Sequence, residues 1–249
     1  MKNKVIVILG SSGRIGTSVS EHLIQRGFKV ILVDKKNIKK DSIKKNKNII
    51  VKTTNVFSEK KLAQLIKDIK NNYRNIDAVV NCIYPNHKKW GKYLIHNIKK
   101  KILDEHFSNH LSNIVIMTKH FTNFFLKQGH GNIVYLSSIQ GIGAPKFEHY
   151  KGTKLNSSIE YSIIKAGIIN MTKYLAKYFK GKNIRFNCVS FGGIKDNQPL
   201  IFQRNYKKSC LNKGLLDPKD INEVFSFLLS DNSKYINGQN IIVDDGWSL

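Results

Sequence analysis

The chain has 249 residues, of which 41% are hydrophobic, and its formal net charge at pH 7 is +25. This hydrophobic content suffices for a sizeable core, and no apolar run approaches the about 18 residues that a membrane span needs, so we expect no membrane segment. The basic charge suggests a phosphate-binding face, but the lysines are spread along the whole chain without an aromatic-interleaved motif, so we expect no specific nucleic-acid partner.

Short apolar runs alternate with longer stretches of helical spacing. The predicted strands are Val5–Leu9, Lys29–Val33, Asn48–Val51, Ala78–Asn81, Asn132–Leu136, Ile184–Val189 and Asn240–Val243. The predicted helices are Ile15–Arg26, Glu59–Asn71, Phe107–Lys127, Ser158–Phe179 and Pro218–Leu229. This alternation predicts an α/β fold, a parallel sheet with helices on both faces. No repeat, linker or composition shift divides the chain, so we expect a single domain over residues 1–249.

A glycine-rich turn joins the first predicted strand to the first predicted helix. Glycine is needed there where φ is unusual and where the backbone must approach a pyrophosphate, and the helix N-terminus favours a phosphate. The spacing of the three glycines is G-x-x-G-x-x-G, and their place after an apolar strand predicts a dinucleotide site. The candidate cofactor contacts in the turn are Gly10, Ser12, Gly13, Arg14, Ile15 and Gly16.

The second predicted strand is followed by an acid, Asp34, about 20 residues after the glycines. A carboxylate there can accept hydrogen bonds from the adenosine ribose and repel a 2′-phosphate, which favours NAD. Arg14, Lys35 and Lys36 are basic groups that can pair with a 2′-phosphate, so NADP stays open. The simpler alternative is that Asp34 is a solvated loop acid.

Tyr161 and Lys165 lie four residues apart in a stretch of helical apolar spacing. Side chains so spaced share one helix face, and a nearby cation lowers the pKa of a tyrosine. The phenol then becomes a usable proton donor or acceptor near neutral pH. Tyr150 and Lys154 have the same spacing, but Gly152 and its polar surroundings make a poor helix. We therefore predict that Tyr161 is the catalytic tyrosine.

The three cysteines, Cys82, Cys188 and Cys210, are odd in number and are spaced like neither a zinc site nor a disulfide framework. Cys82 and Cys188 fall at the ends of apolar strands, where a small buried thiol is the simplest interpretation. We expect no metal and a reducing, cytoplasmic environment.

Five features follow the order found in the short-chain dehydrogenase/reductase family, and together they cover nearly the whole chain. They are the glycine turn, Asn81, Ser137-Ser138, Tyr161-x-x-x-Lys165 and Phe191-Gly192-Gly193-Ile194. The chain resembles that family. The resemblance implies a Rossmann-type doubly wound parallel sheet of about seven strands, and hydride transfer between a nicotinamide and a carbonyl or alcohol.

The resemblance also implies roles for single residues. Tyr161 would be the general acid or base, Lys165 would lower its pKa and hold the nicotinamide ribose, and Ser138 would bind the substrate oxygen. The expected cofactor contacts outside the turn are Asn55 with Val56 near the adenine, Asn81 along the cofactor, and Gly192 with Ile194 at the nicotinamide, together with Asp34, Tyr161 and Lys165.

Two positions depart from the family pattern. His110 stands where family members usually carry an asparagine that helps to hold a water in a proton relay. Histidine can donate, accept and titrate near neutral pH, so the relay either survives through His110 or is lost. Phe191 replaces the usual proline before Gly192, which puts the shape of the pocket in doubt.

The interval from Ser138 to Tyr161 exceeds that usual in the family, which predicts a loop over Gly143–Ser157 beside the pocket. Its basic and hydroxyl-bearing residues favour an anionic sugar derivative as the small-molecule substrate, although they also match the general lysine excess of the chain. Segments such as Lys173–Gly181 and Ser233–Leu249 resemble the family branch linked to flagellin modification and legionaminic-type nonulosonic acid biosynthesis.

Two other functions stay open at this point. A 3-oxoacyl-carrier-protein reductase would suit the basic surface, and a non-catalytic dinucleotide-binding protein would suit the departures at His110 and Phe191. Family members commonly pair through the two long helices, here about 107–127 and 158–179, so we expect a homodimer or homotetramer, which the like charge opposes at low salt.

Overall fold

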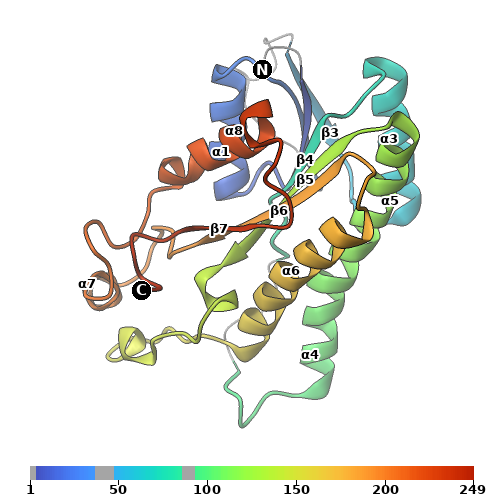
Figure 1. Ribbon diagram of the computed structural model, residues 1–249. Helices are drawn as coiled ribbons and strands as arrows, with labels where there is room; N and C mark the ends of the chain where they lie inside the picture. Colours follow the sequence, from blue (N-terminus) through green and yellow to red (C-terminus); the bar gives the residue numbers. More distant parts are fainter. Residues whose placement is uncertain (1–3, 37–47, 86–92) are drawn as a thin grey trace.

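Seven strands form one parallel sheet in the computed structural model, which describes residues 4–36, 48–85 and 93–249. The strand order across the sheet is β3-β2-β1-β4-β5-β6-β7 (Figure 1). The strands are β1 (Val5–Leu9), β2 (Lys29–Asp34), β3 (Ile49–Thr53), β4 (Ala78–Asn81), β5 (Gly131–Ser138), β6 (Ile184–Phe191) and β7 (Asn240–Val243). This arrangement confirms the predicted Rossmann-type, doubly wound fold.

Helices cover both faces of the sheet, as Figure 1 shows. The helices α1 (Arg14–Gln25) and α8 (Asn222–Leu229) lie on one face, and α3 (Glu59–Tyr73), α5 (Asn113–Gln128) and α6 (Ile159–Tyr178) lie on the other. The shorter helices α4 (Lys100–Phe107) and α7 (Leu200–Lys207) precede α5 and follow β6 in the chain. Among the described residues, no helix is both long and apolar enough to span a bilayer.

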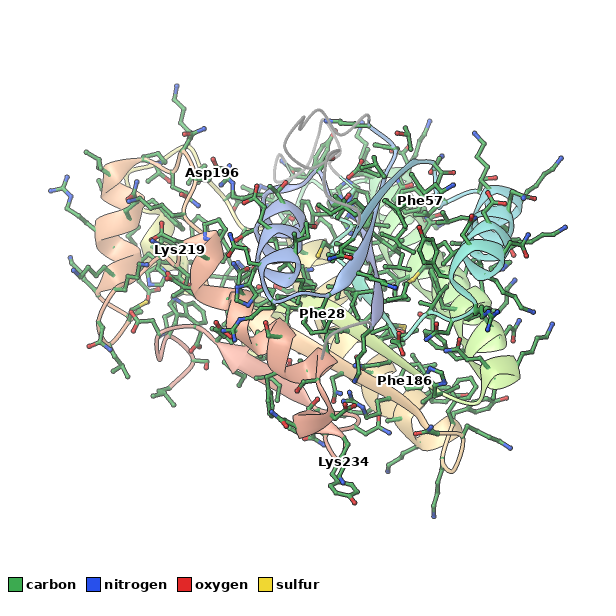
Figure 2. All side chains as sticks on the ribbon, turned by 90° about the horizontal axis from the view of Figure 1, so that it is seen from above. Phe28, Phe57, Phe186, Asp196, Lys219 and Lys234 are labelled. Atoms are coloured by element: carbon green, nitrogen blue, oxygen red, sulfur yellow. The ribbon has the colours of Figure 1, made fainter. Side chains whose placement is uncertain are left out.

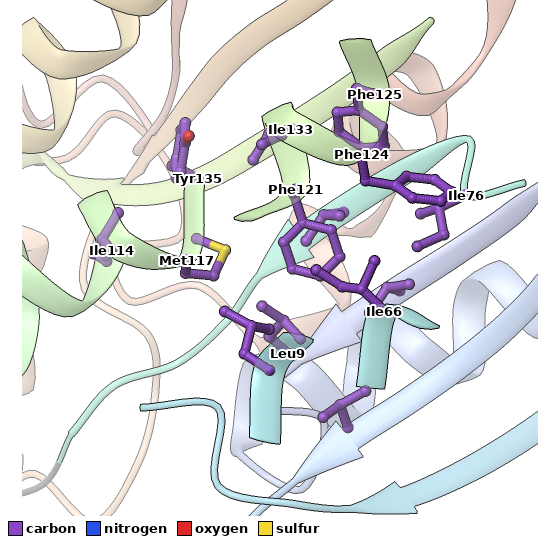
Figure 3. Close-up of a cluster of buried hydrophobic side chains, with 14 of the residues drawn as sticks. Leu9, Ile66, Ile76, Ile114, Met117, Phe121, Phe124, Phe125, Ile133 and Tyr135 are labelled. Carbon is purple, nitrogen blue, oxygen red and sulfur yellow. The ribbon is translucent and has the colours of Figure 1, made fainter. Parts of the chain in front are cut away.

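The strand β1 is apolar at every position because each face of the sheet packs on a layer of helices. In β1, Val7 and Leu9 belong to the core shared with α3, α5 and α6, while Ile6 and Ile8 belong to the core shared with α1 and α8. Figure 3 shows the first of these cores, in which Phe121 and its aromatic neighbours from α5 pack on the strands. The two cores fix the sheet whose carboxyl edge carries the site.

Three helical segments differ from the sequence prediction. The helix expected over Pro218–Leu229 begins as a 3-10 helix, Pro218–Ile221, and only Asn222–Leu229 forms α8. The helix expected over Phe107–Lys127 begins earlier, as α4, and passes through a π-helical turn at Ser108–Ser112 before α5. Helix α7 was not predicted, because its eight residues bury only Phe202 and Tyr206, which is too few to produce a periodic pattern.

The strand order reverses between β1 and β4, so their connections leave toward opposite faces and open a crevice at the carboxyl edge. The strands β5 and β6 run in register to Ser138 and Phe191, beyond the ends predicted from their apolar runs. They carry the serine pair and the Gly192 turn to the same edge. Figure 2 shows this molecule from above, with long basic side chains extending from its rim into solvent.

Candidate functional site

The glycine turn lies directly over the crevice, and its backbone is too close-packed for side chains. Gly10 has φ +76°, and a Cβ there would lie 2.8 Å from the backbone nitrogen of Ile83. A Cβ on Gly16 would lie 2.2 Å from the carbonyl oxygen of Gly10. Helix α1 begins at Arg14, so its first N–H groups point to the crevice. This cradle fits the pyrophosphate of a dinucleotide.

Asp34 lies beside the turn, because β1 and β2 pair in parallel and end together. Its carboxylate accepts hydrogen bonds from the backbone N–H of Ser12 at 3.0 Å and of Lys36 at 3.1 Å. These two bonds hold the carboxylate at the mouth of the cradle, where it is placed to accept from a ribose hydroxyl and to repel a phosphate.

Arg14 is engaged on the other side of the crevice. Its guanidinium donates to the carbonyl oxygen of Lys195 at 3.0 Å and forms an ion pair with Asp196, in the loop after β6. The hydrogen bond from Arg14 lowers the pKa of the Asp196 carboxyl. Arg14 therefore links the glycine turn to that loop, and its guanidinium is not directed to Asp34, where a 2′-phosphate would lie.

The two asparagines predicted at the cofactor are held by local bonds. Asn81 ends β4 and is buried, and its side-chain oxygen accepts from the backbone N–H of Ile83 at 3.2 Å. The side-chain oxygen of Asn55 accepts from the backbone N–H of Phe57 at 3.1 Å. Val56 and Asn81 line a narrow pocket together with His110. These residues continue the edge away from the substrate cavity.

A cavity of about 310 Å³ opens between the carboxyl ends of β4, β5 and β6. Of the sequence-predicted residues, it brings together Ile15, Ser138, Tyr161, Lys165, Gly192 and Ile194. None of the turn glycines lines this cavity, and neither do Asp34, Asn55 or His110. The predicted set therefore divides into a chemical centre at the cavity and a row of contacts along the crevice.

At the chemical centre, Ser138 hydrogen-bonds the hydroxyl of Tyr161. Burial raises the pKa of Tyr161, and the bond with Ser138 opposes this rise. Lys165 is 7% exposed, and its ammonium donates to the carbonyl oxygen of Leu136 at 3.0 Å. Burial lowers the pKa of Lys165 to about 8. These groups form a donor set around the position of a reacting oxygen.

The sequence predicted that Lys165 lowers the pKa of Tyr161. In the structure, burial of the phenol is the largest influence, and it raises this pKa. The geometry gives the reason. The Lys165 nitrogen lies 5.5 Å from the centre of the Tyr161 ring and is directed to Leu136, so it lies over the ring and not at the hydroxyl.

His110 lies in the π-helical turn before α5 and is buried. Burial, with a smaller contribution from the Lys165 charge, lowers the pKa of His110 to about 4, against a hydrogen bond to the backbone of Pro85 that raises it. His110 is therefore neutral at pH 7. It stands near the centre without lining the cavity.

The alternative pair at Tyr150 and Lys154 does not form one helical face. Tyr150 ends a 3-10 helix, Phe147–Tyr150, and Lys154 lies beyond it, outside the cavity lining. The Tyr150 hydroxyl lines the cavity and accepts from the side-chain amide of Gln140 at 3.3 Å. Tyr150 thus belongs to the wall of the cavity.

Sequence reasoning missed most of that wall. Lys146, His149 and Tyr150 come from the predicted loop, but Tyr206 on α7 and Trp247 near the end of the chain had no motif to mark them. The Tyr206 and Trp247 rings stack at 6.2 Å, and the Lys146 nitrogen lies 4.7 Å from the centre of the Trp247 indole. Two ammonium groups therefore line the cavity, Lys146 among these rings and Lys165 at the chemical centre.

Tyr84 was also missed. It lies three residues after Asn81, lines the cavity, and meets the rings of Tyr161 and His110 edge-on, at 6.2 and 5.4 Å between centroids. Its nearness to Asn81 was the one available signal in the sequence. Among the described residues, no cluster of potential ligands could hold a metal ion.

Comparisons with known proteins relate the whole chain to one family and fold. Residues 10–248 match a family model described as enoyl-(acyl carrier protein) reductase. The chain is 40% identical, over 100% of both chains, to post-translational flagellin modification protein A of Campylobacter coli. It is 31% identical to 7alpha-hydroxysteroid dehydrogenase of Bacteroides fragilis, over 100% of this chain and 95% of that protein. A solved short chain dehydrogenase of Leptospira borgpetersenii with bound NAD+ is similar with a TM-score of 0.90 and 26% identity, over 100% of this chain and 94% of that chain.

Proposed function

This chain belongs to the short-chain dehydrogenase/reductase family of NAD(P)-dependent oxidoreductases, and we propose that it moves hydride between NAD and a carbonyl or alcohol carbon of an anionic sugar derivative. The observation that carries the proposal is the convergence of Ser138, Tyr161 and Lys165 on a cavity bounded by Gly192 and Ile194. We further propose a role in the biosynthesis of a surface glycan of the nonulosonic acid type, which the flagellin-modification relative supports.

When bound, the nicotinamide supplies or accepts the hydride, and the residues of this chain manage the proton. Tyr161 gives its hydroxyl proton to the substrate oxygen in reduction and takes it back in oxidation. Ser138 donates to the same oxygen and holds it beside Tyr161. Lys165 stabilises negative charge at Tyr161 and would hold the nicotinamide ribose. Because Ser138 and Lys165 are buried, their dipole and charge act more strongly than they would in solvent.

Two contacts support NAD over NADP. Asp34 presents its carboxylate, fixed by the N–H groups of Ser12 and Lys36, at the mouth of the glycine cradle. Arg14, a candidate partner for a 2′-phosphate, is paired with Asp196 on the far side of the crevice. A phosphate beside Asp34 would meet like charge within a few ångströms, which disfavours NADP.

The wall of the cavity supports a sugar substrate. The rings of Tyr206 and Trp247 offer an apolar face for the C–H groups of a sugar, and Lys146 offers a cation for a phosphate or carboxylate. A long acyl chain would offer Lys146 no anion, so its ammonium would keep only the hydrogen bond to the carbonyl oxygen of Trp247. The runner-up, a 3-oxoacyl-carrier-protein reductase, therefore has less support from this cavity.

We also propose a cytoplasmic homodimer or homotetramer. The outer faces of α5 and α6 expose apolar side chains, among them Val115 at 51%, Ile163 at 46% and Tyr174 at 63%. Helix pairs of this kind are suited to pack on a second copy. Sedimentation at low and at moderate salt tests this proposal: assembly that strengthens with salt is expected, because the net charge is +25.

The test of the function is a substrate screen. Purified protein is mixed with NAD+ and with phosphorylated or nucleotide-linked sugars, and absorbance at the NADH band is followed. Turnover of a sugar that Tyr161→Phe abolishes supports the proposal. Turnover of acetoacetyl-coenzyme A with NADPH, and of none of the sugars, would instead favour the function of a 3-oxoacyl-carrier-protein reductase. Dinucleotide binding with no turnover of either class would favour the non-catalytic alternative.

A further inference from the structure

Tyr84 lies beside the buried groups around the reacting position, and nothing in the proposed mechanism uses it. It follows β4 in the chain and lines the cavity. Its ring contacts Tyr161 and His110 edge-on, and the Lys165 nitrogen lies 5.9 Å from its centre. The side chain is 42% exposed, so one side of the ring meets solvent while the other meets these groups.

The surroundings of Lys165 explain what this ring supplies. The titratable groups that face the ammonium are Tyr161 on α6, Tyr84 after β4, His110 in the π-helical turn and Cys188 on β6. Its hydrogen-bond acceptor is the carbonyl oxygen of Leu136. Within the part of the chain that the structure describes, no carboxylate forms an ion pair with Lys165.

A buried ammonium without a carboxylate loses its proton easily, because burial disfavours the charged form. Burial indeed lowers the pKa of Lys165 to about 8. An aromatic ring within about 6 Å of a cation acts in the opposite direction, since the negative face of the ring attracts the charge, and the attraction strengthens when water is excluded. The Lys165 nitrogen lies at this distance from two rings, those of Tyr84 and Tyr161.

We propose that Tyr84 is a positioning residue of the catalytic centre: its ring covers the Lys165 ammonium, keeps it protonated, and so maintains the positive charge that stabilises a Tyr161 phenolate. This inference rests on the proposed function for its catalytic consequence, but the charge state of Lys165 is independent of any substrate. The ring, not the hydroxyl, carries the effect.

The direction of the effect follows from linkage. Without the Tyr84 ring the protonated form of Lys165 is less stable, so its pKa falls below about 8. Near neutral pH a larger share of Lys165 is then neutral, and a Tyr161 phenolate loses its counter-charge. The Lys165 nitrogen lies 5.5 Å from the centre of the Tyr161 ring, so loss of its positive charge destabilises a phenolate there and raises the apparent pKa for Tyr161 as a base. Oxidation of an alcohol therefore needs a higher pH.

The first test measures Lys165 itself. Wild type, Tyr84→Leu and Tyr84→Phe are labelled briefly with acetic anhydride over a pH series, and the Lys165 peptide is quantified by mass spectrometry. We expect the pKa of Lys165 to fall by about half to one pH unit in Tyr84→Leu, and to stay at the wild-type value in Tyr84→Phe, which keeps the ring. Equal values in all three proteins would overturn the proposal. Tyr84→Met replaces the leucine variant if that variant does not fold.

The second test uses turnover of the sugar identified by the screen. We expect the rising limb of kcat against pH for alcohol oxidation to move upward by about half to one pH unit in Tyr84→Leu, with a loss of about 3- to 10-fold at pH 7. Tyr84→Phe should retain the wild-type profile. A rise in KM with an unmoved limb would show that Tyr84 only contacts substrate, which contradicts the proposal. If wild type binds no dinucleotide, the proposed function fails, while the labelling result still decides the role of Tyr84.

Discussion

The carboxyl edge of the sheet has two halves that the chain builds in different ways. The dinucleotide half is local, because Gly10–Gly16 and Asp34 lie at the ends of the neighbouring strands β1 and β2. The substrate half takes Lys146, Tyr206 and Trp247 from three segments far apart in the sequence. A short motif can specify the first half, whereas the second exists only once the sheet has folded.

The halves also differ in what holds them. In the dinucleotide half, backbone approaches backbone, and the position of Gly16 leaves no space for a Cβ. In the substrate half, rings pack on rings, and His149 donates to or accepts from Ser209 at 2.8 Å. Single changes in the first half should therefore weaken or re-tune cofactor binding, while changes in the second should alter the choice of substrate.

The largest effect is expected where the halves meet, at Tyr161. Tyr161→Phe removes the proton donor and should lower kcat by about 10²- to 10⁴-fold, with the Kd for NADH unchanged. Tyr150→Phe is the matched control, because Tyr150 lines the same cavity and belongs to the alternative pair. Steady-state kinetics and NADH fluorescence give the two quantities. A loss in Tyr150→Phe with full activity in Tyr161→Phe would reverse the assignment.

The next effect separates the dinucleotide half from the rest. A Cβ on Gly16 would lie 2.2 Å from the Gly10 oxygen, so Gly16→Ala must displace the turn and should raise the Kd for NADH by about 100-fold, or about 2.7 kcal/mol. Gly143→Ala is the control, since a Cβ there meets nothing within 4 Å. Fluorescence titration gives the Kd, with melting temperatures to check folding. Unchanged NADH binding by Gly16→Ala would refute the cradle.

A smaller effect is expected in the substrate half. Lys146→Met removes the ammonium beside Trp247 and should raise KM for an anionic sugar about 10-fold, as the loss of one charged hydrogen bond would, while leaving the Kd for NADH unchanged. Lys154→Met is the control, because Lys154 lies in the same loop but outside the cavity. Initial rates over a range of sugar concentrations give KM. Equal KM values in both variants would mean that the cavity does not bind an anion.

The smallest effect is expected at His110. Because burial lowers its pKa to about 4, His110 carries no charge between pH 6 and 8, and its protonated form appears only as the pH falls toward about 4. His110→Asn should therefore change kcat by less than about 3-fold and leave the pH profile unaltered above pH 6. A kcat limb near pH 6.5 that disappears in the variant would show instead that His110 titrates during turnover.

Much of the fold was predictable because buried parallel strands are continuous apolar runs, as in β1 and β4. The ends of the strands were less predictable. Ser137 and Ser138 follow the apolar run of β5, although both are still part of the strand. Helix α7 was missed because only two of its residues, Phe202 and Tyr206, are buried, which is too few to produce a periodic apolar pattern.

The candidate site shows the same division. Gly10, Asp34 and Ser138 could be found because each stands next to a strand whose apolar pattern is clear. Trp247 could not be found, because no spacing relates it to the residues that it contacts, and the only signal for Tyr84 was its nearness to Asn81. The direction of the Tyr161 pKa was also beyond the sequence, since it depends on burial and on the orientation of Lys165.

The most direct test of the central claim is a pair of titrations of the purified protein, one with NADH and one with NADPH, at moderate salt, followed by the fluorescence of the dinucleotide. The cradle and the fixed carboxylate of Asp34 predict that NADH binds at least about tenfold more tightly than NADPH, and that Asp34→Asn narrows the difference. Tighter binding of NADPH would contradict the role given to Asp34, and binding of neither would contradict the assignment of the chain as an NAD-dependent oxidoreductase.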